Sequence, residues 1–541
     1  MSTKSPPDPH HPPEEDPNMR TKILLPIACL ATGALALAGC TTGSTSSDPV
    51  KSGEMSTDTI RTTLEVPTSF DPTQTLGLPD FWMTRLGFDT LVRQDDNGHF
   101  ASGLAESWDV NPNGATFTLR EGLTCSDGTP ITASVVKDSL EYLANPATAS
   151  PVIGQVFGPG NSATFAADDA RTVKVSLGEP WPDLLSGLAI SSAGVICPAG
   201  LKDPKALADG TAKGAQSGPY VLSDRQHGVS YTFTLRDDYH AWPKYSSEVP
   251  GVPAKTLVFN VVGDRNTQAN LLLSKQLDII QIDGALMERF KNEPDYTVST
   301  QPFSDFYVIF NQREGSPFRN PETRKAVAQV LDAKTFEGIT SNGHGQASRS
   351  LVAEGTTCAA PDKAPVIQSD PEAAKKVLQG VDIRLVGPTI AGPQGSGNVY
   401  IQEQLRAAGA NVTLKNSDLG TWVGQVYGEP SSWDMTMFAD LNFPGTMANP
   451  LTAFIGPTIQ EGGGNVGATN NTETEKAFAA FRASTNADDT CAALQESMHS
   501  LIANADAIPL SNSPRLTVAG KGFEIAHRGS TIDDPILRIT Q

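Results

Sequence analysis

Short runs in which apolar and polar residues alternate recur along the chain and predict its strands. Alternation with a period of two places every second side chain on the same face, as in a half-buried β-strand. The clearest runs read TFTL, VKVSL and YTFTL, and they occupy residues 116–119, 173–177 and 231–235. We therefore expect β-sheets with one buried face each.

Helical spacing of apolar residues occurs between these runs. Residues 132–143 begin with a potential capping residue, Thr132, and place three apolar side chains on one face: Val136, Leu140 and Leu143. Another helix is predicted to begin at Asp370-Pro371, with a buried stripe formed by Ala374, Val377 and Leu378. No segment of 20 to 50 residues repeats, which disfavours solenoids and propellers. The fold class is mixed α/β, in more than one lobe.

The first forty residues have the pattern of an export signal behind an unusual extension. Residues 1–18 are rich in proline and acidic residues, whereas Arg20 and Lys22 precede an apolar run that ends at Cys40. The run is short for a membrane span and typical of a signal peptide. Its end, Leu37-Ala38-Gly39-Cys40, resembles the lipobox of bacterial lipoproteins, which implies cleavage before Cys40 and lipid attachment to its sulfur. Translation from Met1 and from Met19 are both compatible with this pattern.

Charge and composition exclude two classes of partner. The 541 residues carry 40 Lys and Arg against 60 Asp and Glu, a net charge of −20. Such a chain has no basic face for nucleic acid, and an anionic membrane surface would repel it. Residues 40–57 are small and polar, as in a flexible tether. A lipid at Cys40 would therefore provide the attachment to the membrane.

The cysteines outside the signal peptide and the lipidation site are even in number. Four remain: Cys125, Cys197, Cys358 and Cys491. In an exported protein this number favours two disulfides, for which three pairings are possible. A metal site is the alternative, but no CxxC or similar ligand spacing occurs. We expect neither a metal ion nor another cofactor.

Signatures of catalysis are weak. The chain contains no GxSxG, HExxH, Walker A or GxGxxG motif. Ser134 and Lys137 form an SxxK, but they share the polar helix face with Asp138 and Glu141, and no KTG follows. A solvated helix face is the better interpretation, and the histidines are scattered singly. We therefore expect a protein that is not an enzyme.

A series of segments in a fixed order resembles family 5 extracellular solute-binding proteins, the oligopeptide and dipeptide receptors of bacterial ABC importers. The resemblance covers roughly residues 58–541. It rests on LAESW at 104–108, GATFTLREG at 114–122, DGTPITA at 127–133, SGPY at 217–220, LDI at 277–279, FN at 310–311, PF at 317–318, Arg324, Ala326, Asp332, DPEAA at 370–374 and IPL at 508–510. Each motif is moderately specific, and their order makes the resemblance strong.

The resemblance implies two α/β lobes of the periplasmic-binding-protein type, with an extra subdomain in the first lobe and a hinge that closes a cleft. The expected limits are 1–39 for the extension and signal peptide, 40–57 for the tether, 58–301 for the first lobe with 77–204 inserted, 302–507 for the second lobe, and 508–541 for the return to the first. The crossings are expected near 302–311 and 508–513. Disulfides within the lobes would then join Cys125 to Cys197 and Cys358 to Cys491.

The resemblance also singles out residues for ligand binding. In the family's peptide receptors, an aspartate in an Ala-Asp-aromatic-Asn-Glu-Pro stretch pairs with the peptide α-ammonium. Residues 439–444 read ADLNFP, which makes Asp440 the candidate, although Leu441 and Phe443 depart from the pattern. The alternative is a loop aspartate that caps its own turn. Glu65 and Val66 resemble a strand that bonds to the peptide main chain, and aromatic residues are candidates for side-chain pockets: Phe81, Trp82, Trp422, Tyr427 and Trp433.

Three functions compete at this point. The favoured one is a monomeric, lipid-anchored receptor on the outer side of the cell membrane, which captures small peptides for an ABC permease and its ATPase. The second is capture of another solute on the same fold, such as a metal chelate, a glycoside or an antibiotic. The third is a lipoprotein of this fold that regulates the envelope without transport, or an unrecognised hydrolase.

Overall fold

The computed structural model describes residues 58–95, 98–526 and 535–540. The predicted signal peptide, Cys40 and the tether lie outside the described residues. All three strands predicted from alternation are present, extended by one or two residues at their beginnings: TFTL lies in β5 (Gly114–Leu119), VKVSL in β7 (Thr172–Leu177) and YTFTL in β9 (Ser230–Leu235). In each of them, every second side chain near the centre is buried.

The first lobe is built on a four-stranded sheet in the order β1-β11-β9-β8. The strand β1 (Thr59–Leu64) runs parallel to β11 (Thr256–Val261), and β8 (Tyr220–Gln226) forms the far edge. Helix α1 (Leu78–Gly87) packs on this sheet through Trp82, Met83 and Leu86. Two later strands, β19 (Phe523–Ala526) and β20 (Ile536–Ile539), contribute to the same hydrophobic core. They pair with each other, and β20 also pairs with β10 (Val252–Pro253).

A second sheet of the first lobe has the order β4-β5-β7-β6. It consists of β4 (Ala105–Asn111), β5, β7 and β6 (Ala163–Ala167), and α2 (Ala133–Ala144) packs against it. Thr132 stands at the N-cap of α2, but its side chain makes no capping hydrogen bond. The remaining elements of this region are β2 (Val92–Gln94), β3 (Phe100–Ser102), α3 (Ile153–Phe157), α4 (Leu184–Ala189), α5 (Pro198–Lys202) and α6 (Pro204–Ala208).

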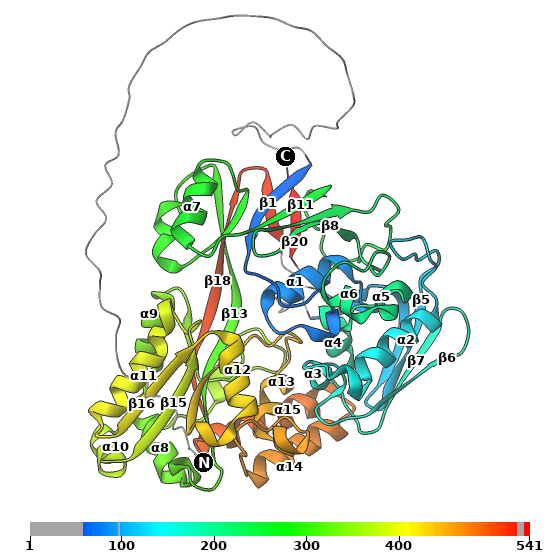
Figure 1. Cartoon of the computed structure of the whole chain (residues 1–541). Coiled ribbons are helices and arrows are strands. Elements are labelled where there is room, and N and C mark those ends of the chain that lie inside the picture. The colour runs from blue at the N-terminus through cyan, green and yellow to red at the C-terminus, as the bar shows by residue number, and fades with distance from the viewer. Residues whose placement is uncertain (1–57, 96–97, 527–534, 541) are drawn as a thin grey trace, which may run out of the picture. The chain divides into compact units, whose positions relative to one another are not determined.

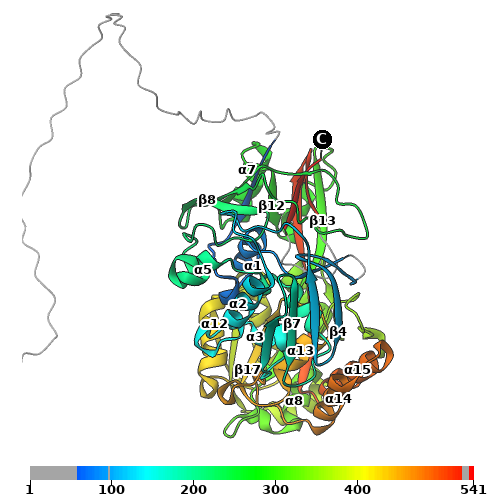
Figure 2. The same cartoon turned by 90° about the vertical axis from the view of Figure 1, so that its right-hand side faces the viewer.

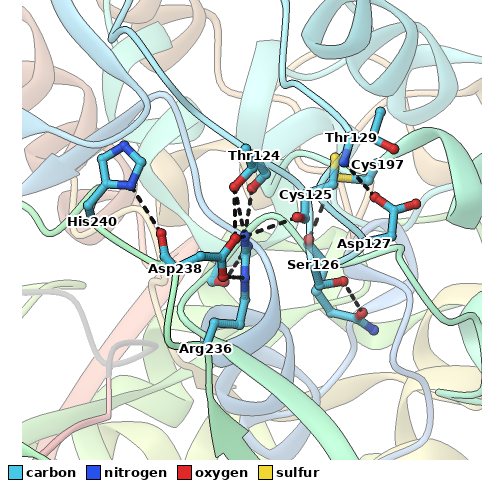
Figure 3. A network of polar contacts seen from close by, with 11 residues as sticks. Thr124, Cys125, Ser126, Asp127, Thr129, Cys197, Arg236, Asp238 and His240 are labelled. Carbon is cyan, nitrogen blue, oxygen red and sulfur yellow. Dashed lines mark hydrogen bonds and ion pairs between the residues drawn. A yellow bond between two sulfur atoms is a disulfide. The ribbon is translucent and has the colours of Figure 1, made fainter.

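A disulfide lies within the region of this second sheet, and a buried arginine joins that region to the base of the first lobe (Figure 3). Cys125 is bonded to Cys197, and Arg236, just after β9, donates hydrogen bonds to the carbonyl oxygens of Thr124, Cys125 and Gly218. Asp238 accepts two further bonds from the same guanidinium. A second disulfide, Cys358–Cys491, lies in the other lobe. Neither bond links one lobe to the other.

Two long strands connect the lobes. They are β13 (Tyr296–Phe310) and β18 (Ala507–Gly520), which lie antiparallel beside each other (Figure 1). At one end β18 pairs with β12 (Ile279–Ile282), which follows α7 (Arg265–Leu273). At the other end β13 pairs with β17 (Met435–Asp440). Their register is interrupted between Pro302 and Ser304. The segments expected to cross between the lobes, 302–311 and 508–513, lie within these strands except for Asn311, which follows the end of β13.

The strands β12, β18, β13 and β17 belong to one seven-stranded sheet, and the second lobe is built around the rest of it. In this part β17, β15 (Asp382–Pro388) and β16 (Asn411–Ser417) run parallel to one another. The short strand β14 (Gln346–Ala347) pairs with β18. The helices of the second lobe are α8 (Pro321–Val330), α9 (Ala333–Ser341), α10 (Pro371–Leu378), α11 (Ser396–Ala407), α12 (Leu419–Gly428) and α13 (Ala448–Leu451). Asp370 caps α10 as predicted, but Val377 is 38% exposed, so the buried stripe consists of Ala374 and Leu378. The helices α14 (Thr472–Ala483) and α15 (Ala487–Ala503) pack against each other (Figure 2).

Candidate ligand site between the two lobes

Asp440 ends the buried strand β17, at the edge of the second lobe that faces the first. Its Oδ1 accepts a hydrogen bond from the backbone N–H of Asn442 at 2.8 Å, and its Oδ2 accepts one from the hydroxyl of Tyr307 at 3.0 Å. Asn442 has a φ of 40°, so the chain turns sharply directly after the strand. Asp440 therefore caps its own turn through Oδ1.

A second buried carboxylate stands beside the first. Asp305 of β13 is the register partner of Asp440, and it accepts a hydrogen bond from the Asn512 amide at 2.5 Å. Burial raises the pKa of Asp305 well above its usual range, and the charge of Asp440 raises it further. Burial also raises the pKa of Asp440, against the opposing effect of its two hydrogen bonds. Among the described residues, neither carboxylate forms a salt bridge.

Buried carboxylates without a cation are unfavourable, because the protein interior solvates charge poorly. Two of them on neighbouring strands repel each other as well. A cationic group placed between the lobes would relieve both effects. The arrangement is thus suited to receive a positively charged or strongly hydrogen-bond-donating part of a small molecule.

Aromatic side chains surround the two carboxylates. Tyr307 stacks on Phe438 with 5.4 Å between the ring centroids, and Phe438 in turn contacts Trp422 at 5.2 Å. The ring centroid of Tyr427 lies 6.5 Å from that of Trp422. Burial raises the pKa of the Tyr427 hydroxyl, and the charge of Asp440 raises it further. The indole of Trp422 donates to the Thr436 hydroxyl. Two of the predicted aromatic residues, Trp422 and Tyr427, are therefore close to Asp440.

Phe81 of the first lobe contacts the second lobe close to this site. Its ring, 1% exposed on α1, stacks on Phe443 with 3.4 Å between the centroids and 10° between the planes. A second contact between the lobes joins Trp181 to the hairpin of α14 and α15, at 5.8 Å from Phe481. All these rings belong to one continuous buried cluster. The lobes therefore meet through aromatic rings, and the contact of Phe81 with Phe443 lies three residues along the chain from Asp440.

The other predicted site residues lie elsewhere. Trp433 is fully buried and donates to the backbone of Val426, so it serves the core. Trp82 faces the core of the first-lobe sheet and covers Arg515. Glu65 is exposed and Val66 is 39% exposed, directly after the end of β1. Neither is a member of the aromatic and acidic group around Asp440.

Sequence reasoning missed three residues of this site: Asp305, Tyr307 and Phe438. One sequence pattern could have pointed to both acids: Asp305 directly precedes the apolar run FYVIF of β13, and Asp440 directly follows the largely apolar run MTMFA of β17. The SxxK motif is not part of the site, because Lys137 pairs with Asp138 and Glu141 on the exposed face of α2. Within the described ranges, no three His, Cys, Asp or Glu side chains are grouped so as to hold a metal ion.

Asp183, just before α4, is a further carboxylate at the boundary between the lobes. Burial raises its pKa from 3.8 to about 6, and a hydrogen bond from the Thr446 side chain in the second lobe opposes part of the rise. Its Oδ2 has no hydrogen-bond partner among the described residues. The folded state thus holds this proton to a higher pH than the unfolded chain, so stability is lost as the pH rises from about 4 to about 6.

We expect Asp183→Asn to raise the free energy of unfolding at pH 7 by about 1–2 kcal/mol and to leave it unchanged near pH 3.5. The side chain makes no capping bond to α4, so the amide costs no helix cap. Urea unfolding at both pH values measures the difference. Asp169→Asn is the control with the opposite sign, because hydrogen bonds lower the pKa of Asp169. An Asp183→Asn effect of equal size at both pH values would contradict this explanation.

Comparison with known proteins agrees with the two-lobed architecture. The family model of the bacterial extracellular solute-binding proteins, family 5 (middle), matches residues 99–461, which is more than half of the chain. The periplasmic murein peptide-binding protein MppA of Escherichia coli is 25% identical over 294 residues, 51% of this chain and 53% of MppA. The dipeptide-binding protein DppE of Bacillus subtilis is 25% identical over 306 residues, 54% of each chain. The chain thus aligns with about half the length of these relatives.

One solved structure matches a larger share of this chain than these two relatives do. A substrate-binding protein from Microbacterium hydrocarbonoxydans, crystallised with 4-hydroxybenzoate hydrazide, is 40% identical, with a TM-score of 0.83 over 90% of this chain and all of that one. Its similarity extends over both lobes and the strands that join them. The order of the motifs, the lobes and the family match all agree: this chain belongs to the bacterial extracellular solute-binding proteins of family 5.

Proposed function

We propose that this protein is the receptor of an ABC importer, which captures a small solute between its lobes and delivers it to a permease driven by an ATPase. The observation that carries the proposal is the buried pair Asp305 and Asp440, which has no cationic partner within residues 58–95, 98–526 and 535–540 and lies where the aromatic residues of the two lobes meet. Such a pair costs stability in the folded protein, and a bound solute with a cationic end removes that cost.

A short peptide is the first ligand class. Its α-ammonium would donate charge-assisted hydrogen bonds to Asp440, each worth about 1.5–3 kcal/mol. The relatives named for murein peptides and dipeptides support this class. Glu65 and Val66 stay a prediction for main-chain contacts. They lie at the end of β1, where an added strand could continue the sheet.

A small aromatic acyl compound is the second ligand class. The relative with 40% identity was crystallised with 4-hydroxybenzoate hydrazide. Here the rings of Phe81 and Phe443 contact each other from opposite lobes. When the lobes separate, these two faces would be free to hold a planar ring. The terminal NH₂ of a hydrazide would donate to Asp440 without carrying a full charge.

Native mass spectrometry of the protein purified from its own organism identifies the captured solute, and calorimetry with alanyl-phenylalanine and 4-hydroxybenzoate hydrazide then ranks the two classes. We expect one of them to bind with a Kd in the micromolar range or below. Failure of both probes to bind, together with an empty protein in the mass spectrum, would contradict a solute-binding role for the cleft. The expected limits of the lobes, 58–301, 302–507 and 508–541, stay predictions.

The lipid anchor at Cys40 is tested separately. In the described part of the chain no helix has the length and apolar character needed to cross a membrane. We expect metabolic labelling with a palmitate analogue to mark the wild type and not Cys40→Ala, since only the wild type carries the acceptor sulfur. Cys29→Ala is the matched control and should be labelled normally. Equal labelling of wild type and Cys40→Ala would contradict the anchor on the outer side of the membrane.

A further inference from the structure

A long loop of the second lobe connects β14 to α10. All of residues 348–370 are described, and among them a single 3₁₀ turn, Pro361–Lys363, is the only regular element. Loops of this length without helices or strands are uncommon inside a folded domain, and they usually carry a function. The first half of this loop, residues 348–359, extends from the acidic pair to exposed positions such as Glu354 and Thr357.

The 348–359 loop contacts the acidic pair through its backbone. Burial raises the pKa of Asp305, and a hydrogen bond from the backbone N–H of Ala353 opposes part of the rise. Leu351 and Val352, which are 0% and 1% exposed, belong to the same buried cluster as Tyr307. The position of this loop therefore determines one of the hydrogen bonds that the Asp305 carboxylate accepts.

One face of α15 holds the 348–359 loop in place. Cys358 is bonded to Cys491, and its carbonyl oxygen accepts a hydrogen bond from the Gln495 side chain at 2.8 Å. Nearer to the acidic pair, the Ser350 hydroxyl donates to the sulfur of Met498 at 3.4 Å. Positions 491, 495 and 498 follow one another at helical spacing and share a face of α15. The loop is thus attached along this face, covalently at the disulfide and by hydrogen bonds beside it.

The two disulfides of the protein differ in their access to solvent. Cys125 and Cys197 are both 0% exposed, whereas Cys358 and Cys491 are partly exposed. A thiolate must reach a disulfide sulfur in order to attack it, so exposure decides which bond is reduced first. Cys358 also has a φ of 70°, a left-handed conformation that is unfavourable for a residue with a Cβ. The disulfide holds the loop in this conformation, and cleavage of the bond would let the backbone relax.

We propose that Cys358–Cys491 is a site of thiol–disulfide exchange, and that its reduction by a dithiol releases the 348–359 loop from α15 and weakens solute binding between the lobes. One thiolate of the dithiol attacks a sulfur of the bond and forms a mixed disulfide. The second thiolate then attacks the dithiol's own sulfur and displaces the protein thiolate. The protein gains two electrons and two protons as two thiols, and the dithiol becomes a disulfide.

This inference rests on the proposed function in one respect, that the solute binds beside Asp305. It goes further by placing the shape of that site under redox control. A site that is competent in only a fraction of the molecules has its apparent Kd raised by the inverse of that fraction. If the released loop stays docked in about a tenth of the molecules, the Kd rises about tenfold.

Peptide mapping, hydrogen exchange and calorimetry on the purified full-length chain test the inference. Under native conditions, dithiothreitol followed by iodoacetamide should alkylate Cys358 and Cys491 and leave Cys125 bonded to Cys197. Hydrogen exchange in residues 348–359 should then become faster, while exchange in the first-lobe strand β5 stays unchanged. The probes for calorimetry are alanyl-phenylalanine and 4-hydroxybenzoate hydrazide. For the probe that binds the oxidised protein, we expect the Kd to rise about tenfold after reduction.

The double variant Cys358→Ala with Cys491→Ala is the matched comparison. It should bind the probe as the reduced wild type does, and dithiothreitol should not change its affinity. Urea unfolding shows whether this variant is folded. The reduced and alkylated wild type provides the same comparison without a substitution, so the inference stays testable if the variant fails to fold.

The outcomes separate the inference from the proposed function. Alkylation of Cys125 and Cys197 together with the other pair overturns the selective exchange site. Selective reduction that leaves either the exchange of residues 348–359 or the Kd unchanged overturns the control of binding by the disulfide. Absence of binding by both probes to the oxidised protein contradicts the proposed function and with it the effect on binding, whereas faster exchange after reduction would still support release of the loop.

Discussion

Replacing Asp440 by asparagine should lower the affinity for a peptide with a free α-ammonium by two or more orders of magnitude. The asparagine retains an oxygen for the backbone N–H of Asn442, so the turn after β17 is preserved. The ligand's ammonium, in contrast, loses its counter-charge in a site closed to water. Leaving a buried charge unpaired costs about 3–5 kcal/mol, more than the net value of the bond itself.

Acetylation of the peptide amine should cause the same loss in the wild type. In a cycle of wild type and Asp440→Asn with free and acetylated peptide, the two losses should not add, because both delete one interaction. Asp418→Asn, at the exposed N-cap of α12, is the control and should bind both peptides as the wild type does. If the acetylated peptide binds the wild type as tightly as the free one, Asp440 is no ammonium anchor and the aromatic acyl class gains support.

Replacing Arg236 by methionine should destabilise the first lobe by about 3–5 kcal/mol. The guanidinium satisfies three carbonyl oxygens, of Thr124, Cys125 and Gly218, and methionine can donate to none of them. These carbonyls come from two segments, 124–125 and 218, and the disulfide Cys125–Cys197 does not join one of them to the other. The loss should therefore appear as reduced stability with the disulfide intact.

Urea unfolding of the oxidised protein measures this effect. Arg171→Met is the matched control, since Arg171 bridges two exposed glutamates on the surface of the same lobe. Its loss should cost less than about 1 kcal/mol. Equal effects of the two substitutions would show that the buried network contributes no more than a surface ion pair.

Much of the fold could be predicted from the sequence, because strands and helices follow from local residue patterns and the family motifs occur in a fixed order along the chain. Alternation identified β5, β7 and β9, and the proline after Asp370 marked the beginning of α10. The error at Val377 has a simple cause: the neighbours that cover α10 leave part of its predicted stripe exposed. Such coverage depends on tertiary packing, which periodicity does not encode.

The site was predictable only in part. Asp440 could be named from the ADLNFP stretch, but its partner Asp305 lies 135 positions earlier, and only the register of β13 and β17 brings them together. Tyr307 carries no motif either, and only the folded chain brings its hydroxyl to Asp440 and its ring to Phe438. Charges that lack a partner are a property of the folded chain, so no pattern of residue types reveals them.

The paired strands β13 and β18 contain a weak point in their hydrogen-bond ladder. Pro302 and Pro514 face each other in register, and neither has a backbone N–H to donate. The ribbon is therefore least stiff at one rung, next to the interrupted register, and it can flex there while the ladders on both sides keep their bonds. Neither disulfide spans this rung, so neither bond restrains the ribbon where Pro302 faces Pro514, and we expect the ribbon to bend there when a solute draws the lobes together.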